Sequence, residues 1–179
     1  MDDISVNGIL YHVEKLLGKG KGGYSYLAWR DGRPVVVKQI HHEPCDYYIF
    51  GNKIEAERRD YDRLLEAGIC IPQMLDIDVA NERIVKEYIE GDTIFDLVAN
   101  GLSAEPYLPL VREMAAKARA ADLNIDYFPT NFIPQGGHLY YVDYECNPYL
   151  EEWNFENWGI KYWSHTPEFE AHLAGKRDP

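Results

Sequence analysis

The residues best suited to chemistry near the N-terminus are a glycine cluster and a lysine. The stretch Gly18-Lys19-Gly20-Lys21-Gly22-Gly23 has the pattern GxGxxG with two lysines inside it. Glycines let backbone amides approach phosphate oxygens closely, and lysines add positive charge beside them. Lys38 follows fifteen residues after Gly23, at the end of a Val-Val-Val run. Taken singly, the glycines would be a flexible hairpin turn and Lys38 a solvated edge residue. Taken together, they favour a site for the phosphate groups of a nucleotide.

A second set of polar residues lies in the other half of the chain. Asp126 and Asn131 form the pattern Asp-x-x-x-x-Asn, and Asp143 follows twelve residues later, after an apolar stretch. Phosphoryl transfer needs a carboxylate that orients and deprotonates the attacking hydroxyl, and it needs oxygen ligands for Mg²⁺. Asp126 fits the first role, and Asn131 with Asp143 fits the second. Taken singly, Asp126 would be a turn residue and Asn131 a loop amide, but their order along the chain favours a joint function.

The glycine cluster must be carried by strands. Residues 9–13 and 24–29 flank it, and residues 34–40 follow a turn at Asp31-Gly32. Two β-forming runs joined by Asp-Gly predict a hairpin. A dinucleotide-binding unit would require a helix directly after the glycines. Because a strand follows instead, the sequence excludes that fold.

Residues 52–67 have helical spacing with a charged outer face, and Gly68 is a natural C-terminal stop. Glu57 lies on or beside the apolar stripe of this predicted helix. An unpaired charge would be costly there. We therefore expect Glu57 to pair with Lys38, with Glu55 as the second candidate.

The remaining predicted elements follow in this order along the chain. Strands are predicted at 73–78 and 83–89, a break at 90–92, a short helix around 97–98, a longer helix at 105–122, and strand-like pieces at 132–133 and 139–142. Strands with one helix come first and mostly helices follow. This order predicts an α+β fold of two lobes, divided into residues 1–90 and 91–179.

These motifs, in this order, resemble the protein-kinase-like superfamily, on the side that includes aminoglycoside and choline phosphotransferases, lipopolysaccharide-core kinases and RIO-type kinases. The resemblance covers roughly residues 9–145. It implies a strand-rich N-lobe whose glycine loop covers ATP, with Lys38 on the α- and β-phosphates, and a reduced helical C-lobe. Residues 84–91 are similar to the hinge that joins the lobes, which implies that Glu87 and Tyr88 contact the nucleotide.

The chain departs from the family pattern in several places. The usual His-x-Asp is Asn124-Ile125-Asp126, and the usual Asp-Phe-Gly is Asp143-Tyr144-Glu145. Only 36 residues follow Asp143, which leaves no room for a long activation segment and the helices that bind peptide substrates. The leading hypothesis is a Mg²⁺- and ATP-dependent phosphotransferase acting on a hydroxyl of a small molecule or protein. A nucleotide-binding pseudokinase or scaffold without turnover, and a plain interaction protein, stay open as alternatives.

The amino-acid composition further limits the kinds of partner that we expect for this protein. The net charge is −12, and binding to nucleic acid rests on basic patches, so no nucleic acid partner is expected. No apolar run approaches the roughly 20 residues that span a bilayer, and the acidic N-terminus lacks the features of a secretion signal. We therefore expect a cytoplasmic protein without a transmembrane segment. The three cysteines are far apart and are expected to be reduced thiols.

The C-terminal tail is rich in aromatic residues, and its role has two interpretations. The aromatics either pack the small C-lobe or form a surface for a protein partner or for self-association. They are Trp153, Phe155, Trp158, Tyr162 and Trp163. His41 and His42 are interpreted as loop residues, because no third metal ligand is suggested near them.

Overall fold

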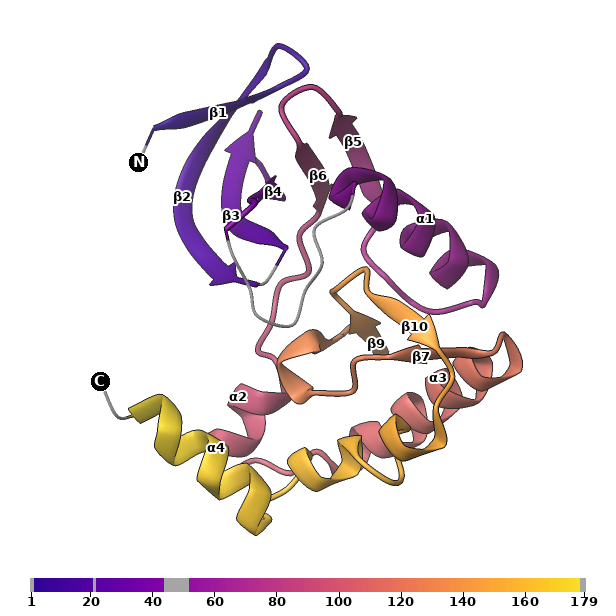
Figure 1. Ribbon diagram of the computed structural model, residues 1–179. Coiled ribbons are helices and arrows are strands. Elements are labelled where there is room, and N and C mark those ends of the chain that lie inside the picture. Colours follow the sequence, from indigo (N-terminus) through magenta and orange to yellow (C-terminus); the bar gives the residue numbers. More distant parts are fainter. Residues whose placement is uncertain (1, 21, 44–51, 178–179) are drawn as a thin grey trace. The chain divides into compact units, whose positions relative to one another are not determined.

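The computed structural model describes residues 2–20, 22–43 and 52–177 (Figure 1). Lys21, one of the predicted phosphate-binding residues, lies outside this part. The described chain forms two compact units. The first comprises residues 1–59 and 72–88, and the second comprises residues 60–71 and 89–179. The fold class is α+β, as predicted, with a strand-rich first unit and most of the helices in the second.

The first unit is built on a six-stranded antiparallel sheet in the order β1-β2-β3-β4-β6-β5. The strands are β1 (Asp3–Val6), β2 (Ile9–Lys19), β3 (Gly23–Arg30), β4 (Arg33–Ile40), β5 (Met74–Asp78) and β6 (Arg83–Glu87). Asp31 and Gly32 both have positive φ, at 51° and 74°, as the predicted two-residue hairpin turn requires. Strand β1 and its turn at Asn7-Gly8 were not predicted.

The core of this unit explains where the Lys38 side chain points. Successive side chains of a strand alternate between the two faces of the sheet. Val35 and Val37 of β4 belong to an apolar cluster on one face. Lys38 and Ile40 share the other face, on which Ile40 packs against Ile54 of helix α1 (Lys53–Glu66). The sheet register thus directs Lys38 to the face that α1 covers.

Helix α1 ends where the sequence predicts. Gly68 has φ of +81°, and the amides of Gly68 and Ile69 donate to the carbonyls of Leu65 and Leu64, each at 3.0 Å. This arrangement satisfies carbonyl groups that the helix end would otherwise leave without partners. The helix contributes residues 53–59 to the first unit and residues 60–66 to the second.

The second unit combines helices with two small antiparallel sheets, β10-β7 and β8-β9. Its helices are α2 (Ile94–Ala99), α3 (Leu108–Ala120) and α4 (Pro167–Arg177), and its strands are β7 (Leu123–Ile125), β8 (Phe132–Gln135), β9 (His138–Tyr141) and β10 (Cys146–Pro148). Single 3₁₀ turns form at Glu105–Tyr107, Pro129–Asn131, Glu151–Trp153 and Gly159–Tyr162. Strands β7 and β10 and helix α4 were not predicted.

Most of the aromatic tail packs inside the second unit. Phe155 and Trp163 are buried, and the Trp163 indole donates a hydrogen bond of 2.8 Å to the Tyr127 carbonyl. At Gly159, a Cβ atom would lie 2.4 Å from the Cβ of Tyr127, so only glycine allows this close approach. Trp153 remains half exposed. The packing interpretation therefore holds for Phe155 and Trp163.

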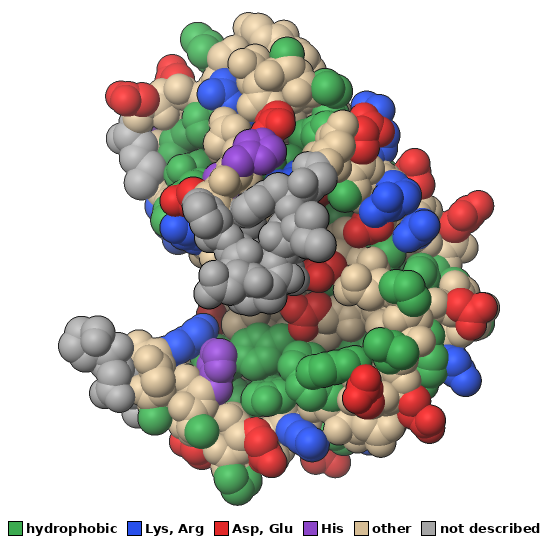
Figure 2. All heavy atoms as spheres, in the orientation of Figure 1, with side chains coloured by type: hydrophobic (Ala, Val, Ile, Leu, Met, Phe, Trp, Pro, Cys, Tyr) green, Lys and Arg blue, Asp and Glu red, His purple; other side chains and the backbone are tan. Residues whose placement is uncertain are grey.

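The surface agrees with the acidic composition. Figure 2 shows Asp and Glu side chains (red) over both units on the face drawn, together with a hydrophobic area (green) in the second unit. Among the described residues, no helix is both long enough and apolar enough to cross a membrane.

Candidate active site

The glycine cluster forms the tip of the β2–β3 hairpin in the first unit. Strand β2 continues through Gly18 to Lys19, and β3 begins at Gly23. The Gly20 amide donates to the Gly23 carbonyl at 2.9 Å and closes the tip. The predicted strand–loop–strand arrangement is therefore present, although the strands extend further into the glycine cluster than the sequence indicated.

The glycines of this tip serve different purposes. A Cβ at Gly23 would lie 2.7 Å from the Gln39 carbonyl oxygen and 3.0 Å from Lys38 Cε, so glycine is needed where β3 begins to pair with the end of β4. Among the described residues, a Cβ at Gly18 would meet nothing within 4 Å, and one at Gly20 would make only contacts of 4.0 Å. Packing within the protein therefore explains Gly23 but leaves open space beside Gly18 and Gly20.

Lys38 and Glu57 form an ion pair that joins β4 to α1. Both side chains are largely buried, with 13% and 16% of their surface exposed. The sequence predicted this partner, and Glu55 instead lies 3.6 Å from Arg58 on the same helix. Gly22 is close by, because a Cβ there would lie 3.9 Å from Lys38 Nζ. The structure thus brings the glycine tip, the lysine and the glutamate together within one unit.

Lys19 takes part in a different set of contacts. Its ammonium lies 3.4 Å from the Glu43 carboxylate and 5.2 Å from the centre of the Tyr24 ring. Hydrogen bonding to Tyr24 and Glu43 raises the pKa of Lys19. The Tyr24 hydroxyl also donates to Glu43 at 2.6 Å. Lys19 is therefore engaged at the side of the glycine tip.

The predicted hinge residues lie at the end of β6. The Glu87 amide donates to the Gln73 carbonyl at 2.9 Å, and the Glu87 carboxylate accepts from the Gln73 amide at 3.2 Å. Tyr88 follows directly and is half-buried. The amide and the carboxylate of Glu87 are thus both bonded to the backbone of Gln73.

In the second unit, Asp126 follows strand β7 at the start of a tight loop. Its carboxylate accepts from the Phe128 amide at 3.1 Å, and its carbonyl accepts from the Asn131 side chain at 3.2 Å. Burial raises the pKa of Asp126, and the charges of Glu145 and Asp143 raise it further, against the lowering effect of the Phe128 and Asn131 hydrogen bonds. The loop thus holds a carboxyl group whose pKa is raised mainly by burial.

The predicted metal ligands lie at one end of the β8–β9 hairpin. Asn131 immediately precedes β8, Asp143 comes two residues after β9, and the Val142 amide donates to the Asn131 carbonyl at 2.9 Å. The Asp143 carboxylate accepts from the Tyr144 amide at 2.7 Å. Among the described residues, no group of three or more His, Cys, Asp or Glu side chains is placed to hold a metal ion. The predicted set of one amide and one carboxylate would leave the remaining ligand positions to other donors.

Tyr141 connects these two segments, and no sequence pattern indicated this connection. Its side chain is fully buried, and its hydroxyl donates to the Glu145 carbonyl at 2.7 Å. The same hydroxyl accepts from the Asp126 amide at 3.2 Å. The hydroxyl therefore ties the loop of Asp126 to the segment that contains Asp143 and Glu145.

Asn124, which stands in place of the family histidine, is also buried. Its amide nitrogen donates to the Leu150 carbonyl at 3.1 Å, which fastens β7 to the start of the tail.

An aromatic residue in an apolar strand indicates core packing, so Tyr141 could not be recognised from the sequence. Glu145 had one weak signal, its place two residues after Asp143.

One curated protein resembles the chain in sequence. It is the KEOPS complex subunit Bud32 of Pyrococcus abyssi (strain GE5 / Orsay), 30% identical over 92 residues. The match covers 49% of this chain and 41% of Bud32, so the chain spans about two fifths of that relative. No protein-family model matches the chain. The similarity supports the protein-kinase-like superfamily for the half of the chain that it covers.

Proposed function

We propose that this protein is a Mg²⁺- and ATP-dependent phosphotransferase that transfers the γ-phosphate to a hydroxyl group of an acceptor. The observation that carries the proposal is the Lys38–Glu57 ion pair, which lies beside Gly22 of the glycine tip. Kinase-like proteins use a lysine–glutamate pair of this kind to hold the α- and β-phosphates of ATP. The open space beside Gly18 and Gly20 suits backbone contacts with phosphate oxygens.

Asp126 is assigned the role of general base. A base must accept the acceptor's hydroxyl proton near neutral pH, and burial raises the pKa of Asp126 toward that range. Its position is fixed on two sides, because the Phe128 amide binds the carboxylate and the Asn131 side chain binds the carbonyl. The proposal therefore places proton transfer at the Asp126 carboxylate.

The residues beside Asp126 fit a magnesium ion. Asn131 and Asp143 offer oxygen ligands, which Mg²⁺ prefers, and Mg²⁺ usually keeps waters and substrate phosphates as its other ligands. The charges of Asp143 and Glu145 both raise the pKa of Asp126, so negative charge accumulates where a cation would relieve it. Bound Mg²⁺ would neutralise charge on the transferred phosphate.

The test is a thermal-shift assay with and without Mg²⁺-ATP, followed by a screen of hydroxyl acceptors for phosphate transfer. Ligand at 100 times its dissociation constant adds about 2.7 kcal/mol of stability. For a chain of this size, that corresponds to roughly 5–10 °C in Tm. Stabilisation with turnover supports the proposal, and stabilisation without turnover on any acceptor indicates a pseudokinase. The absence of any nucleotide effect would overturn both.

A further inference from the structure

His41 lies just after strand β4 and contacts both the glycine tip and the first turn of helix α1. Its imidazole Nε2 is 2.8 Å from the Gly20 carbonyl oxygen, and its amide donates to the Gly22 carbonyl at 3.3 Å. Its own carbonyl accepts a hydrogen bond from the Lys53 ammonium, in the first turn of α1. One residue thus binds both the glycine tip and the helix that carries Glu57.

The imidazole is held in place from two further directions. Its Nδ1 accepts from the Glu43 amide at 3.3 Å, and the Tyr24 ring packs edge-on against it with ring centres 5.1 Å apart. The Glu43 carboxylate also lies 3.6 Å from Nδ1. In the neutral ring with its hydrogen on Nε2, and equally in the protonated ring, Nε2 donates to the Gly20 carbonyl. Only 10% of the His41 side chain is exposed. The contact with Gly20 is therefore part of a packed arrangement.

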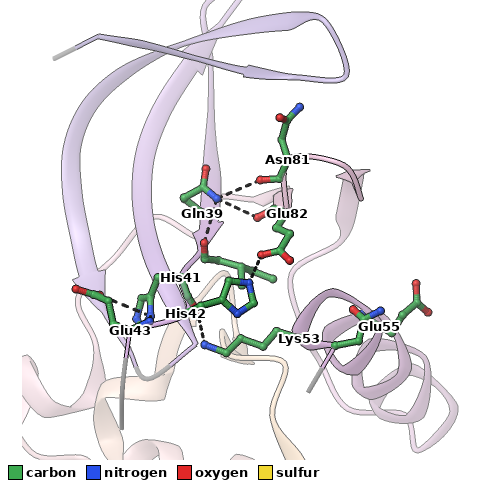
Figure 3. A network of polar contacts seen from close by, with 10 residues as sticks. Gln39, His41, His42, Glu43, Lys53, Glu55, Asn81 and Glu82 are labelled. Atoms are coloured by element: carbon green, nitrogen blue, oxygen red, sulfur yellow. Dashed lines mark hydrogen bonds and ion pairs between the residues drawn. The ribbon is translucent and has the colours of Figure 1, made fainter. Parts of the chain in front are cut away.

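The neighbouring His42 has a different environment. It binds the Glu82 carboxylate and is half exposed. In Figure 3, the two imidazoles point apart, His41 toward Glu43 and His42 toward Glu82, while the Lys53 side chain extends from α1 to the His41 carbonyl. The two histidines are adjacent in sequence, but their partners differ: His41 bonds to Gly20 and Gly22 of the glycine tip, and His42 bonds to Glu82.

From these contacts we propose that His41 is a positioning residue for the triphosphate, acting through Gly20 and through Lys53. A loop with several glycines loses much conformational freedom when it binds a ligand. Anchoring the Gly20 and Gly22 carbonyls removes part of that loss before binding. The Lys53 contact sets the start of α1, and so Glu57, relative to the same anchor. This inference rests on the proposed function, because it assigns His41 to the ATP site.

The experiment compares three variants. His41→Ala removes the Gly20 contact, His41→Gln keeps a side-chain N–H donor of similar reach, and His42→Ala is the matched control. The loss of one hydrogen bond and of the pre-organised loop predicts a 5- to 20-fold lower affinity of His41→Ala for Mg²⁺-ATP, or about 1–2 kcal/mol. Adenosine affinity is expected to change less than twofold, because adenosine has no phosphate for the loop to bind. His41→Gln should recover most of the lost affinity, and His42→Ala should match the wild type.

A second measurement separates this inference from the proposed function. Hydrogen–deuterium exchange without nucleotide should be faster in His41→Ala for peptides that contain Gly20 and Gly22, and unchanged in His42→Ala. If ATP does not bind the wild type, the proposed function fails and the role of His41 in triphosphate binding fails with it, whatever the exchange rates show. If ATP does bind but His41→Ala retains wild-type exchange and affinity, the inference is overturned while the proposed function stands.

Discussion

The Lys38 ammonium and the Glu57 carboxylate form an ion pair between strand β4 and helix α1, with most of both side chains removed from solvent. Removing one partner of such a pair leaves the other charge poorly solvated. We expect Lys38→Met to lower the free energy of unfolding by about 1–3 kcal/mol and to abolish stabilisation by Mg²⁺-ATP. Denaturant unfolding and thermal shift measure the two effects.

Two control variants separate the stability cost of an unpaired buried charge from the loss of ATP binding. In the double variant Lys38→Met with Glu57→Met, neither charge is left buried, so stability should partly recover while ATP binding stays lost. Glu55→Gln, on the exposed face of the same helix, should behave as the wild type. If the double variant still binds ATP, the assignment of Lys38 to the phosphates is wrong.

The glycine tip gives a second prediction. Gly23→Ala places a methyl group 2.7 Å from the Gln39 carbonyl oxygen, and backbone cannot move aside cheaply. We expect a loss of about 1–3 kcal/mol in the free energy of unfolding, as for other overpacked sites. Gly18→Ala meets no atom of the described residues within 4 Å and should fold with nearly wild-type stability. Equal effects of the two changes in urea unfolding would refute this account of the tip.

Local patterns were enough to predict the glycine hairpin, the β3–β4 turn and helix α1 with its stop at Gly68. The alternation of apolar and polar residues, an Asp-Gly turn and helical spacing are signals that each extend over only a few residues. Two other local signals were overlooked, namely the Asn7-Gly8 turn after β1 and the Thr166-Pro167 helix start before α4, where Thr166 caps the Phe169 amide at 3.1 Å.

Other features depended on tertiary packing and could not be predicted locally. Strands β7 and β10 are three residues long each and exist because they pair with one another across twenty residues of chain. The hydroxyl contacts of Tyr141 and the side-chain contact of His41 with Gly20 join residues that no sequence pattern connects. The roles of Asp126, Asn131 and Asp143 stay predictions until they are measured.

Asp78 gives a prediction about acid stability. Its carboxylate accepts from the amides of Asn7 and Asn81, at 2.9 and 3.0 Å, and from the Asn81 side chain at 2.9 Å. The Asn7 amide bond and the two Asn81 bonds lower the pKa of Asp78 from 3.8 to about 2. A lowered pKa means that the ionised group stabilises the fold above the unfolded pKa and that this contribution is lost as pH falls toward 2.

Asp78→Asn would place an N–H donor against groups that already donate. We expect this variant to melt several degrees below the wild type at pH 7, and we expect the gap to narrow between pH 4 and pH 2. Thermal melts followed by circular dichroism across this range provide the measurement. A gap that is constant with pH would show that the carboxylate charge is not the cause.

The ionised carboxylate of Asp126 is expected to lower stability, whereas that of Asp78 raises it. Its folded pKa is raised, so ionisation opposes folding above that pKa, and the penalty disappears as pH falls below the unfolded value of 3.8. Asp126→Asn keeps an oxygen for the Phe128 amide but carries no charge. We expect a Tm higher by a few degrees at pH 7, a gain that shrinks toward pH 4, and a turnover about 10²–10⁴-fold lower. Nucleotide stabilisation should persist, and full activity in this variant would exclude Asp126 as the base.

Tyr141→Phe tests whether the loop of Asp126 must be tied to the segment that follows β9. The change keeps the buried ring and removes the oxygen that bridges the Asp126 amide and the Glu145 carbonyl. Two partly buried backbone groups then lack this partner, so we expect about 1–3 kcal/mol less stability. Because Asp126 loses its fixed position relative to Asp143, we also expect kcat to fall about 10- to 100-fold with little change in the KM for ATP.

The matched control is Tyr127→Phe, which removes a hydroxyl from a neighbouring tyrosine that is equally buried. Its ring edge-packs against Phe155, and its hydroxyl joins no two segments among the hydrogen bonds of the described residues. A merely structural role for the Tyr141 hydroxyl would lower Tm and leave kcat unchanged at temperatures where the variant is folded. A positioning role lowers kcat at those temperatures, in the variant of Tyr141 and not in that of Tyr127. Steady-state kinetics well below both melting temperatures therefore separate the two roles.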